Sequence, residues 1–142
     1  MGFIDRIRAY AERASAGEDG KAHGPDAGTR SPLERDLIKR LQEKLAQGDA
    51  PIRYHLLFCG NVQGVGFRWT NQGTANELHL TGWVKNLPDG TVEMEIQGPC
   101  AGIIKHLDTV HAYYDRMNCR VWLTEAVERT PARGEDGFSV RY

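Results

Sequence analysis

A glycine-rich segment that ends in an arginine is the part of this sequence best suited to chemistry. Residues 60–68 read Gly-Asn-Val-Gln-Gly-Val-Gly-Phe-Arg and lie between an apolar stretch and a segment of helical character. Glycine allows positive φ and close backbone approach, so successive N–H groups can converge on one anion, and the first N–H groups of a helix add positive potential. Arg68 adds a permanent charge and a planar set of donors. The segment therefore predicts a binding site for one phosphate group.

A nucleotide does not fit the same segment. No Gly-Lys-Ser or Gly-Lys-Thr follows it, and its glycines at positions 60, 64 and 66 do not match the dinucleotide-binding pattern. Taken alone, the glycines are more typical of an ordinary tight turn between a strand and a helix than of a phosphate site. A second polar group favours the phosphate site: Asn86 ends the segment Gly82-Trp83-Val84-Lys85-Asn86 and precedes an Asp-Gly turn. Its neutral amide can hold a water molecule without repelling a phosphate dianion.

Hydrophobic periodicity predicts the elements that must position these groups. Glycine at position 73 weakens the helix that follows the loop by about 1 kcal/mol relative to alanine, so tertiary packing must hold that helix. Strands are expected over residues 53–59, 81–87, 91–97, 119–123 and 138–142. One helix is expected over residues 67–78, and Pro99 opens a second. The apolar stripe of the second helix comprises Ile103, Ile104, Leu107, Val110 and Tyr114. The order βαββαβ with a closing strand predicts an α+β, ferredoxin-like sandwich, with two helices on one face of an antiparallel sheet.

The first fifty residues predict two short amphipathic helices. Residues 3–14 have helical spacing, and residues 15–30, rich in Gly, Ala, Asp and Glu, predict a flexible linker. Ser31-Pro32-Leu33-Glu34 is a capping box, and the helix it opens should end near Gly48. Its apolar stripe must be buried against its own domain, a second copy of the chain or another protein, and we favour the first two; the stripe comprises Leu33, Leu37, Ile38, Leu41 and Leu45.

Composition excludes several classes of function. The chain has 142 residues and a formal net charge of -1, with no basic cluster around Arg68, so we expect no nucleic acid partner. No apolar run is long enough to cross a membrane. The three cysteines, Cys59, Cys100 and Cys119, form no metal-binding motif and no even set, which favours a reducing cytoplasm. Four histidines lack metal-ligand spacing: His55, His79, His106 and His111.

The loop and the asparagine segment together resemble the acylphosphatase family. The Val-Gln-Gly-Val-Gly-Phe-Arg loop of residues 62–68 and the Gly-Trp-Val-x-Asn strand of residues 82–86 occur in the family's order and separation, and the last five residues are similar to its closing strand. The resemblance covers about residues 52–142. It implies an acylphosphatase-like domain over residues 51–142, preceded by an N-terminal extension over residues 1–50.

The resemblance also implies an activity and a site. It implies metal-independent hydrolysis of the carboxyl-phosphate bond of small acyl phosphates, which yields a carboxylate and inorganic phosphate without a cofactor. Arg68 would bind the phosphoryl group and Asn86 would orient the attacking water as the catalytic pair, and the phosphate-binding residues would be Gln63, Gly64, Val65, Gly66, Phe67 and Arg68. We expect Trp69 and Trp83 to be packing residues beside this site.

Two further points follow from the resemblance. Asn61 stands where many relatives have a basic residue, which implies a lower affinity for phosphate. The family's domain also occurs inside larger carbamoyl-transfer proteins, so the alternative function is a non-catalytic module that binds phosphate or carbamoyl phosphate and acts with a protein partner. The absence of zinc-type cysteine pairs counts against that alternative.

Overall fold

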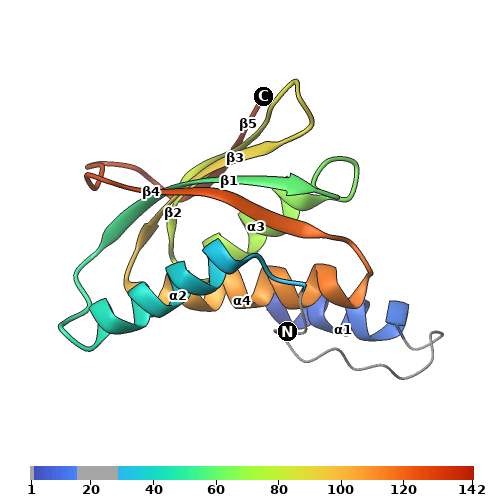
Figure 1. Ribbon diagram of the computed structural model, residues 1–142, viewed down its shortest axis with the longest axis horizontal. Helices are drawn as coiled ribbons and strands as arrows, with labels where there is room; N and C mark the ends of the chain where they lie inside the picture. The colour runs from blue at the N-terminus through green and yellow to red at the C-terminus, as the bar shows by residue number, and fades with distance from the viewer. Residues whose placement is uncertain (1, 16–28) are drawn as a thin grey trace.

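The protein is built on one five-stranded sheet with the strand order β4-β1-β3-β2-β5 (Figure 1). The computed structural model describes residues 2–15 and 29–142. Neighbouring strands are antiparallel, except that β2 and β5 are parallel. The closing strand reaches its place through a long connection instead of a hairpin, so the sheet is mixed. The strands are β1 (Ile52–Gly60), β2 (Thr81–Asn86), β3 (Val92–Gly98), β4 (Val121–Arg129) and β5 (Phe138–Arg141).

Helices α3 (Phe67–Glu77) and α4 (Cys100–Arg116) cover one face of this sheet, as the ferredoxin-like order predicts. The core between them contains the alternate residues of β3 that the sequence places inward, Val92, Met94 and Ile96. Four residues of the expected α4 stripe are buried in the same core, whereas Ile104 is only partly buried. The buried α4 residues are Ile103, Leu107, Val110 and Tyr114.

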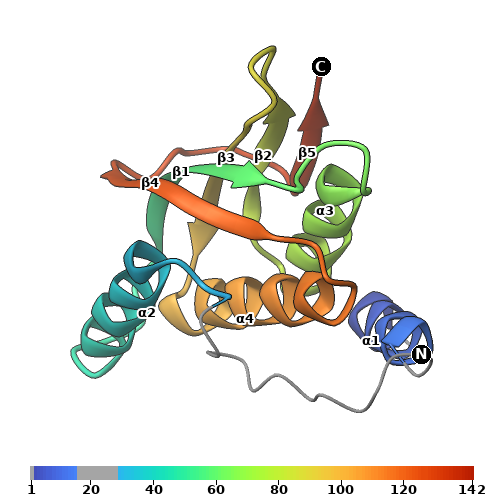
Figure 2. The ribbon, with the colours of Figure 1, turned by 45° about the vertical axis from the view of Figure 1, so that its right-hand side comes forward.

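The extension adds two helices to the same side of the sheet (Figure 2). Helix α1 (Phe3–Ser15) packs against α3 and α4, and α2 (Pro32–Leu45) packs against α4 and β4. The capping box forms as predicted, because Ser31 Oγ accepts a hydrogen bond from the Glu34 amide at 3.1 Å. Leu37 and Leu41 of the α2 stripe join the central core. The stripe therefore packs on its own domain except at Leu45, which is exposed.

Ion pairs fix the start of α2 on α4. Residues 16–28 lie outside the described residues, and with them most of the linker expected over residues 15–30. Near the end of that stretch Arg30 is only 4% exposed. Its Nη1 donates to Asp108 Oδ1 at 2.8 Å, and its Nε lies 3.3 Å from Glu34 Oε2.

None of the helices within residues 2–15 and 29–142 is long and apolar enough to cross a membrane.

The connection between β4 and β5 crosses the face of the sheet that carries no helix. Arg53 of β1 is buried there and donates to Glu95 at 2.6 Å and to Glu135 of the connection at 2.8 Å. Hydrogen bonding from Arg53 holds the pKa of the Glu135 carboxyl below its ordinary value. This contact brings the chain back to the far edge of the sheet, where β5 pairs with β2.

Candidate functional site

The glycine-rich loop joins β1 to α3, and hydrogen bonds to other parts of the chain hold its first half. At its start, the Asn61 amide donates to the Arg120 carbonyl at 2.6 Å, and Asn61 Oδ1 accepts from the Arg120 amide at 2.8 Å. The side chain of Gln63 donates from Nε2 to the carbonyl oxygens of Leu87 at 2.9 Å and Thr91 at 2.8 Å. The loop is thereby tied to the residue before β4 and to the β2–β3 hairpin.

A buried tyrosine orients the peptide between Val65 and Gly66. The Tyr114 hydroxyl lies 3.1 Å from the Val65 carbonyl oxygen and 3.0 Å from Thr70 Oγ1, so it can donate to the first while it accepts from the second. Burial raises the pKa of Tyr114, which keeps its hydroxyl a donor. In a trans peptide the N–H points opposite to the C=O, so the Gly66 N–H faces away from the core.

Two glycines of the loop adopt the left-handed conformation. Gly64 has φ 77° and Gly66 has φ 71°. A Cβ at either position would have open space within 4 Å, so glycine is required here for its backbone conformation and not for room. Gly66 is the N-cap of α3, and no side chain caps this helix. The first N–H groups of α3 are therefore available to an anion.

Arg68 and Asn86 line one cleft of about 520 Å³ together with this loop. Of the expected phosphate-binding residues, Gly64, Gly66 and Phe67 also line it. Gln63 and Val65 do not, since the Gln63 side chain is bound to the hairpin and Val65 packs against the core, which leaves only their backbone for a ligand. The rest of the lining comes from the first part of the loop, from α3 and from the C-terminal segment: Val62, Trp69, Gln72, Ser139, Val140 and Tyr142.

Arg68 and Asn86 have unused hydrogen-bonding capacity in the cleft. The Arg68 guanidinium lies 5.0 Å from the centre of the Tyr142 ring and forms no ion pair with any residue that the structure describes. Asn86 Oδ1 is shielded from solvent and accepts no hydrogen bond within the described part of the chain. A buried acceptor without a donor costs about 1–3 kcal/mol, so a donor that entered the cleft would relieve this cost.

The tryptophans differ from the sequence-based expectation. Trp69 is 59% exposed and lines the cleft, so it is not simply a packing residue. Trp83 lies on the other face of the sheet, where the Arg141 guanidinium is 4.5 Å from its ring centre, and it does not line the cleft. The buried residues of α3 are Phe67, Thr70, Asn71, Thr74 and Ala75. A helical projection of this stripe places Trp69 outside it, and that signal could have predicted the exposure.

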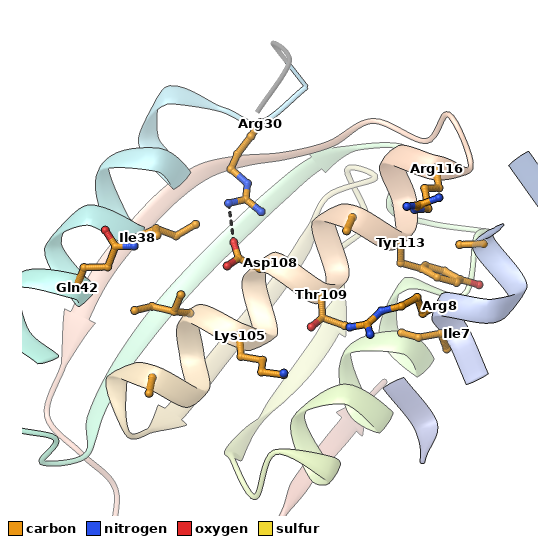
Figure 3. A pocket seen from close by; sticks show the side chains of 14 residues that line it. Ile7, Arg8, Arg30, Ile38, Gln42, Lys105, Asp108, Thr109, Tyr113 and Arg116 are labelled. Atoms are coloured by element: carbon orange, nitrogen blue, oxygen red, sulfur yellow. Dashed lines mark hydrogen bonds and ion pairs between the residues drawn. The ribbon is translucent and has the colours of Figure 1, made fainter. Parts of the chain in front are cut away.

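A second groove, of about 620 Å³, lies between the extension and α4 (Figure 3). It contains the Arg30–Asp108 ion pair and the basic side chains of Arg8, Lys105 and Arg116. None of the residues predicted to bind phosphate or to act in catalysis lines it. No group of three or more histidine, cysteine, aspartate or glutamate residues in the described ranges is placed to hold a metal ion.

Comparisons with known proteins match the same part of the chain. The model of the acylphosphatase family matches residues 54–140. An acylphosphatase of Geobacillus thermodenitrificans is 53% identical over 90 residues, which are 63% of this chain and 94% of that protein. The crystal structure of acylphosphatase from Bacillus subtilis superposes with a TM-score of 0.52 at 33% identity and covers 64% of this chain and 99% of its own. The structure of HypF from T. kodakarensis gives 0.54 at 29% identity, over 64% of this chain but only 12% of that one.

Proposed function

Because the chain belongs to the acylphosphatase family, we propose that it hydrolyses the carboxyl-phosphate bond of small acyl phosphates without a metal ion. The products would be a carboxylate and inorganic phosphate. One observation carries the proposal: the uncapped start of α3, the left-handed glycines, Arg68 and Asn86 all border a single cleft.

The loop and Arg68 would hold the phosphoryl group. The N–H groups of the loop and of the first turn of α3 donate to phosphoryl oxygens, and Arg68 adds charge-assisted hydrogen bonds worth about 1.5–3 kcal/mol each. Phosphoryl transfer to water depends on positioning and on stabilisation of charge, and the carboxylate is already a good leaving group. Residues of this kind can therefore supply the rate enhancement without a protein general base.

Asn86 would place the attacking water. Its unpaired Oδ1 can accept a hydrogen bond from a water molecule that enters the cleft. The lone pair of that water would then face phosphorus on the side opposite the leaving carboxylate. A neutral amide does this without repulsion from the phosphate, which an aspartate at this position would cause.

The test is hydrolysis of benzoyl phosphate in the presence of a chelator. The wild-type protein should turn it over, and Arg68→Ala should lower kcat/KM by about 10²-fold or more, as for loss of one donor to a developing charge. Arg129→Ala is the matched control, because this exposed arginine at the end of β4 does not line the cleft. Inorganic phosphate should inhibit competitively. An Arg68→Ala protein as active as the wild type would refute the role of this residue.

The match to a small part of T. kodakarensis HypF favours one second candidate. In it, the same cleft would bind phosphate or carbamoyl phosphate without turnover and would act with a protein partner. Calorimetry separates the two candidates: heat of phosphate binding combined with no hydrolysis of benzoyl phosphate or carbamoyl phosphate would favour the binding module.

A further inference from the structure

The N-terminal extension contacts the wall of the cleft through one aromatic pair. Phe3 of α1 packs edge-on against Trp69 of α3, with ring centres 4.8 Å apart and ring planes at 69°. Trp69 directly follows Arg68 and lines the cleft, and more than half of its surface is exposed. Residues 1–53 lie outside the range that the family model matches, so this contact is an addition to the family's domain.

Two further contacts fix Phe3 on α3. A Cβ at Gly73 would lie 2.5 Å from Cε1 and Cε2 of the Phe3 ring, so the ring fits only because residue 73 has no side chain. The backbone N–H of Ile4 donates to Glu77 Oε2 at 2.6 Å and so joins the start of α1 to the end of α3. Gly73 lies one turn after Trp69, and the Phe3 ring therefore rests in a notch of α3 beside the indole.

The lining of the cleft has a positively charged part and an apolar part, as an acyl phosphate has a phosphate end and an organic end. Gly64, Gly66 and Arg68 offer N–H groups and positive charge, which suit the phosphate end of the substrate. Trp69, Val140 and Tyr142 offer apolar surface in the same cleft. With the phosphate on the loop, the organic end of the substrate would reach these apolar side chains, and an indole presents a broad flat face to an aromatic ring.

We propose that Trp69 is a platform for the acyl group, held in place by Phe3, and that it makes the site prefer aromatic over small aliphatic acyl phosphates. This rests on the proposed function for the phosphate end of the same cleft. Trp69 touches the acyl group, whereas Phe3 acts through Trp69 and is a positioning residue. Without Phe3, the exposed indole gains rotamer freedom, and that freedom must be lost again when a ligand is bound.

Binding of two non-hydrolysable analogues tests this proposal without reliance on turnover. Phenacylphosphonate and acetonylphosphonate carry CH2 in place of the bridging oxygen and differ only in the phenyl or methyl group of the acyl end. Calorimetry on the full chain gives the ratio of their dissociation constants. We expect Trp69→Ala to reduce the preference for the phenyl ligand by about 3- to 10-fold, the range for loss of one aromatic contact. Phe3→Ala should reduce it in the same direction by less, and Phe3→Leu, which retains bulk in the notch, should restore part of it.

Tyr10→Ala is the matched control. Tyr10 is the other aromatic residue of α1, is 52% exposed, and has its ring centre 6.4 Å from that of Tyr113 on α4. It does not line the cleft, so its removal should leave the ratio at the wild-type value. A Phe3→Ala protein that behaves like Tyr10→Ala would overturn the role of Phe3.

The remaining outcomes separate this proposal from the catalytic one. If Trp69→Ala weakens both phosphonates equally, or leaves their ratio unchanged, the platform is refuted even when benzoyl phosphate is hydrolysed. If the wild-type protein binds the phenyl ligand selectively but does not hydrolyse benzoyl phosphate, the catalytic proposal fails and the platform stands. If it binds neither phosphonate, both proposals fail.

Discussion

At the scale of single residues, charge distinguishes Arg68 from Asn86 in the cleft. Arg68 is permanently charged and can make several hydrogen bonds to one phosphoryl group, whereas Asn86 is neutral and offers one buried acceptor. A dianionic substrate would tolerate the amide beside it because the amide carries no charge. The proposed role of residue 86 therefore depends more on its type than on its size.

Changes at Asn86 should separate binding from turnover. Asn86→Ala should lower kcat for benzoyl phosphate by roughly 10²-fold and change KM little, because only the positioning of water is lost. Asn86→Asp keeps the shape but adds a negative charge beside the phosphate, so KM should rise as well. Steady-state kinetics of both variants measure the difference. Equal KM values for the two variants would show that residue 86 does not face the phosphate.

At the scale of elements, Gly73 shows why α3 depends on its neighbours. A glycine inside a helix lowers helix stability by about 1 kcal/mol relative to alanine. In this protein the same position receives the Phe3 ring of α1. Packing of the extension thus offsets a local weakness in the helix that carries Arg68 and Trp69.

The effect of Gly73→Ala should depend on Phe3. With Phe3 present, the new methyl group overlaps the ring, so we expect the free energy of unfolding to fall. In a Phe3→Ala background the overlap is gone and the same change should raise stability by up to about 1 kcal/mol. Urea unfolding of the four proteins measures this coupling. The same change in stability in both backgrounds would contradict the contact.

At the scale of the whole molecule, the extension and the family-matched segment share one core. Ile7 and Ala11 of α1 and Leu37 and Leu41 of α2 belong to the same buried cluster as the sheet and α4. Inside it, His106 Nε2 lies 2.8 Å from Asn71 Oδ1, and Asn71 Nδ2 donates to the Phe67 carbonyl at 2.8 Å. Because the Asn71 oxygen faces the ring, His106 must carry its proton on Nε2. These two hydrogen bonds link α4 to the first turn of α3, beside the glycine-rich loop.

His106 should make the whole fold sensitive to acid. Burial lowers the pKa of His106 from 6.5 to about 3, so the unfolded chain binds a proton there that the folded chain does not bind. The free energy of unfolding should therefore fall as the pH decreases from about 6.5 towards 3. Chemical denaturation at several pH values measures this slope. His106→Gln should be less stable at neutral pH but should show a shallower slope, and parallel curves for the two proteins would contradict the prediction.

Much of this protein could be predicted from local patterns. The capping box at Ser31, the β2–β3 hairpin and the strand-loop-helix around Gly64 and Gly66 depend on residues close together in the chain, and the structure contains all three. Arg68 and Asn86 could be selected as candidate site residues because residue type and spacing alone indicate what chemistry they can do. The two side chains line one cleft because α3, which carries Arg68, packs against β2, which ends at Asn86.

Other features depend on contacts between distant residues, and only the tertiary structure decided them. The apolar stripe on α2 predicts that this face of the helix is buried, but it does not predict that α4 and β4 bury it. The parallel pairing of β5 follows from the path of the connection held by Arg53 and Glu135. The contact of Phe3 with Gly73 and Trp69 spans about half of the chain, and neither segment encodes it alone. Periodicity gives the apolar faces, whereas shape and chain path select their partners.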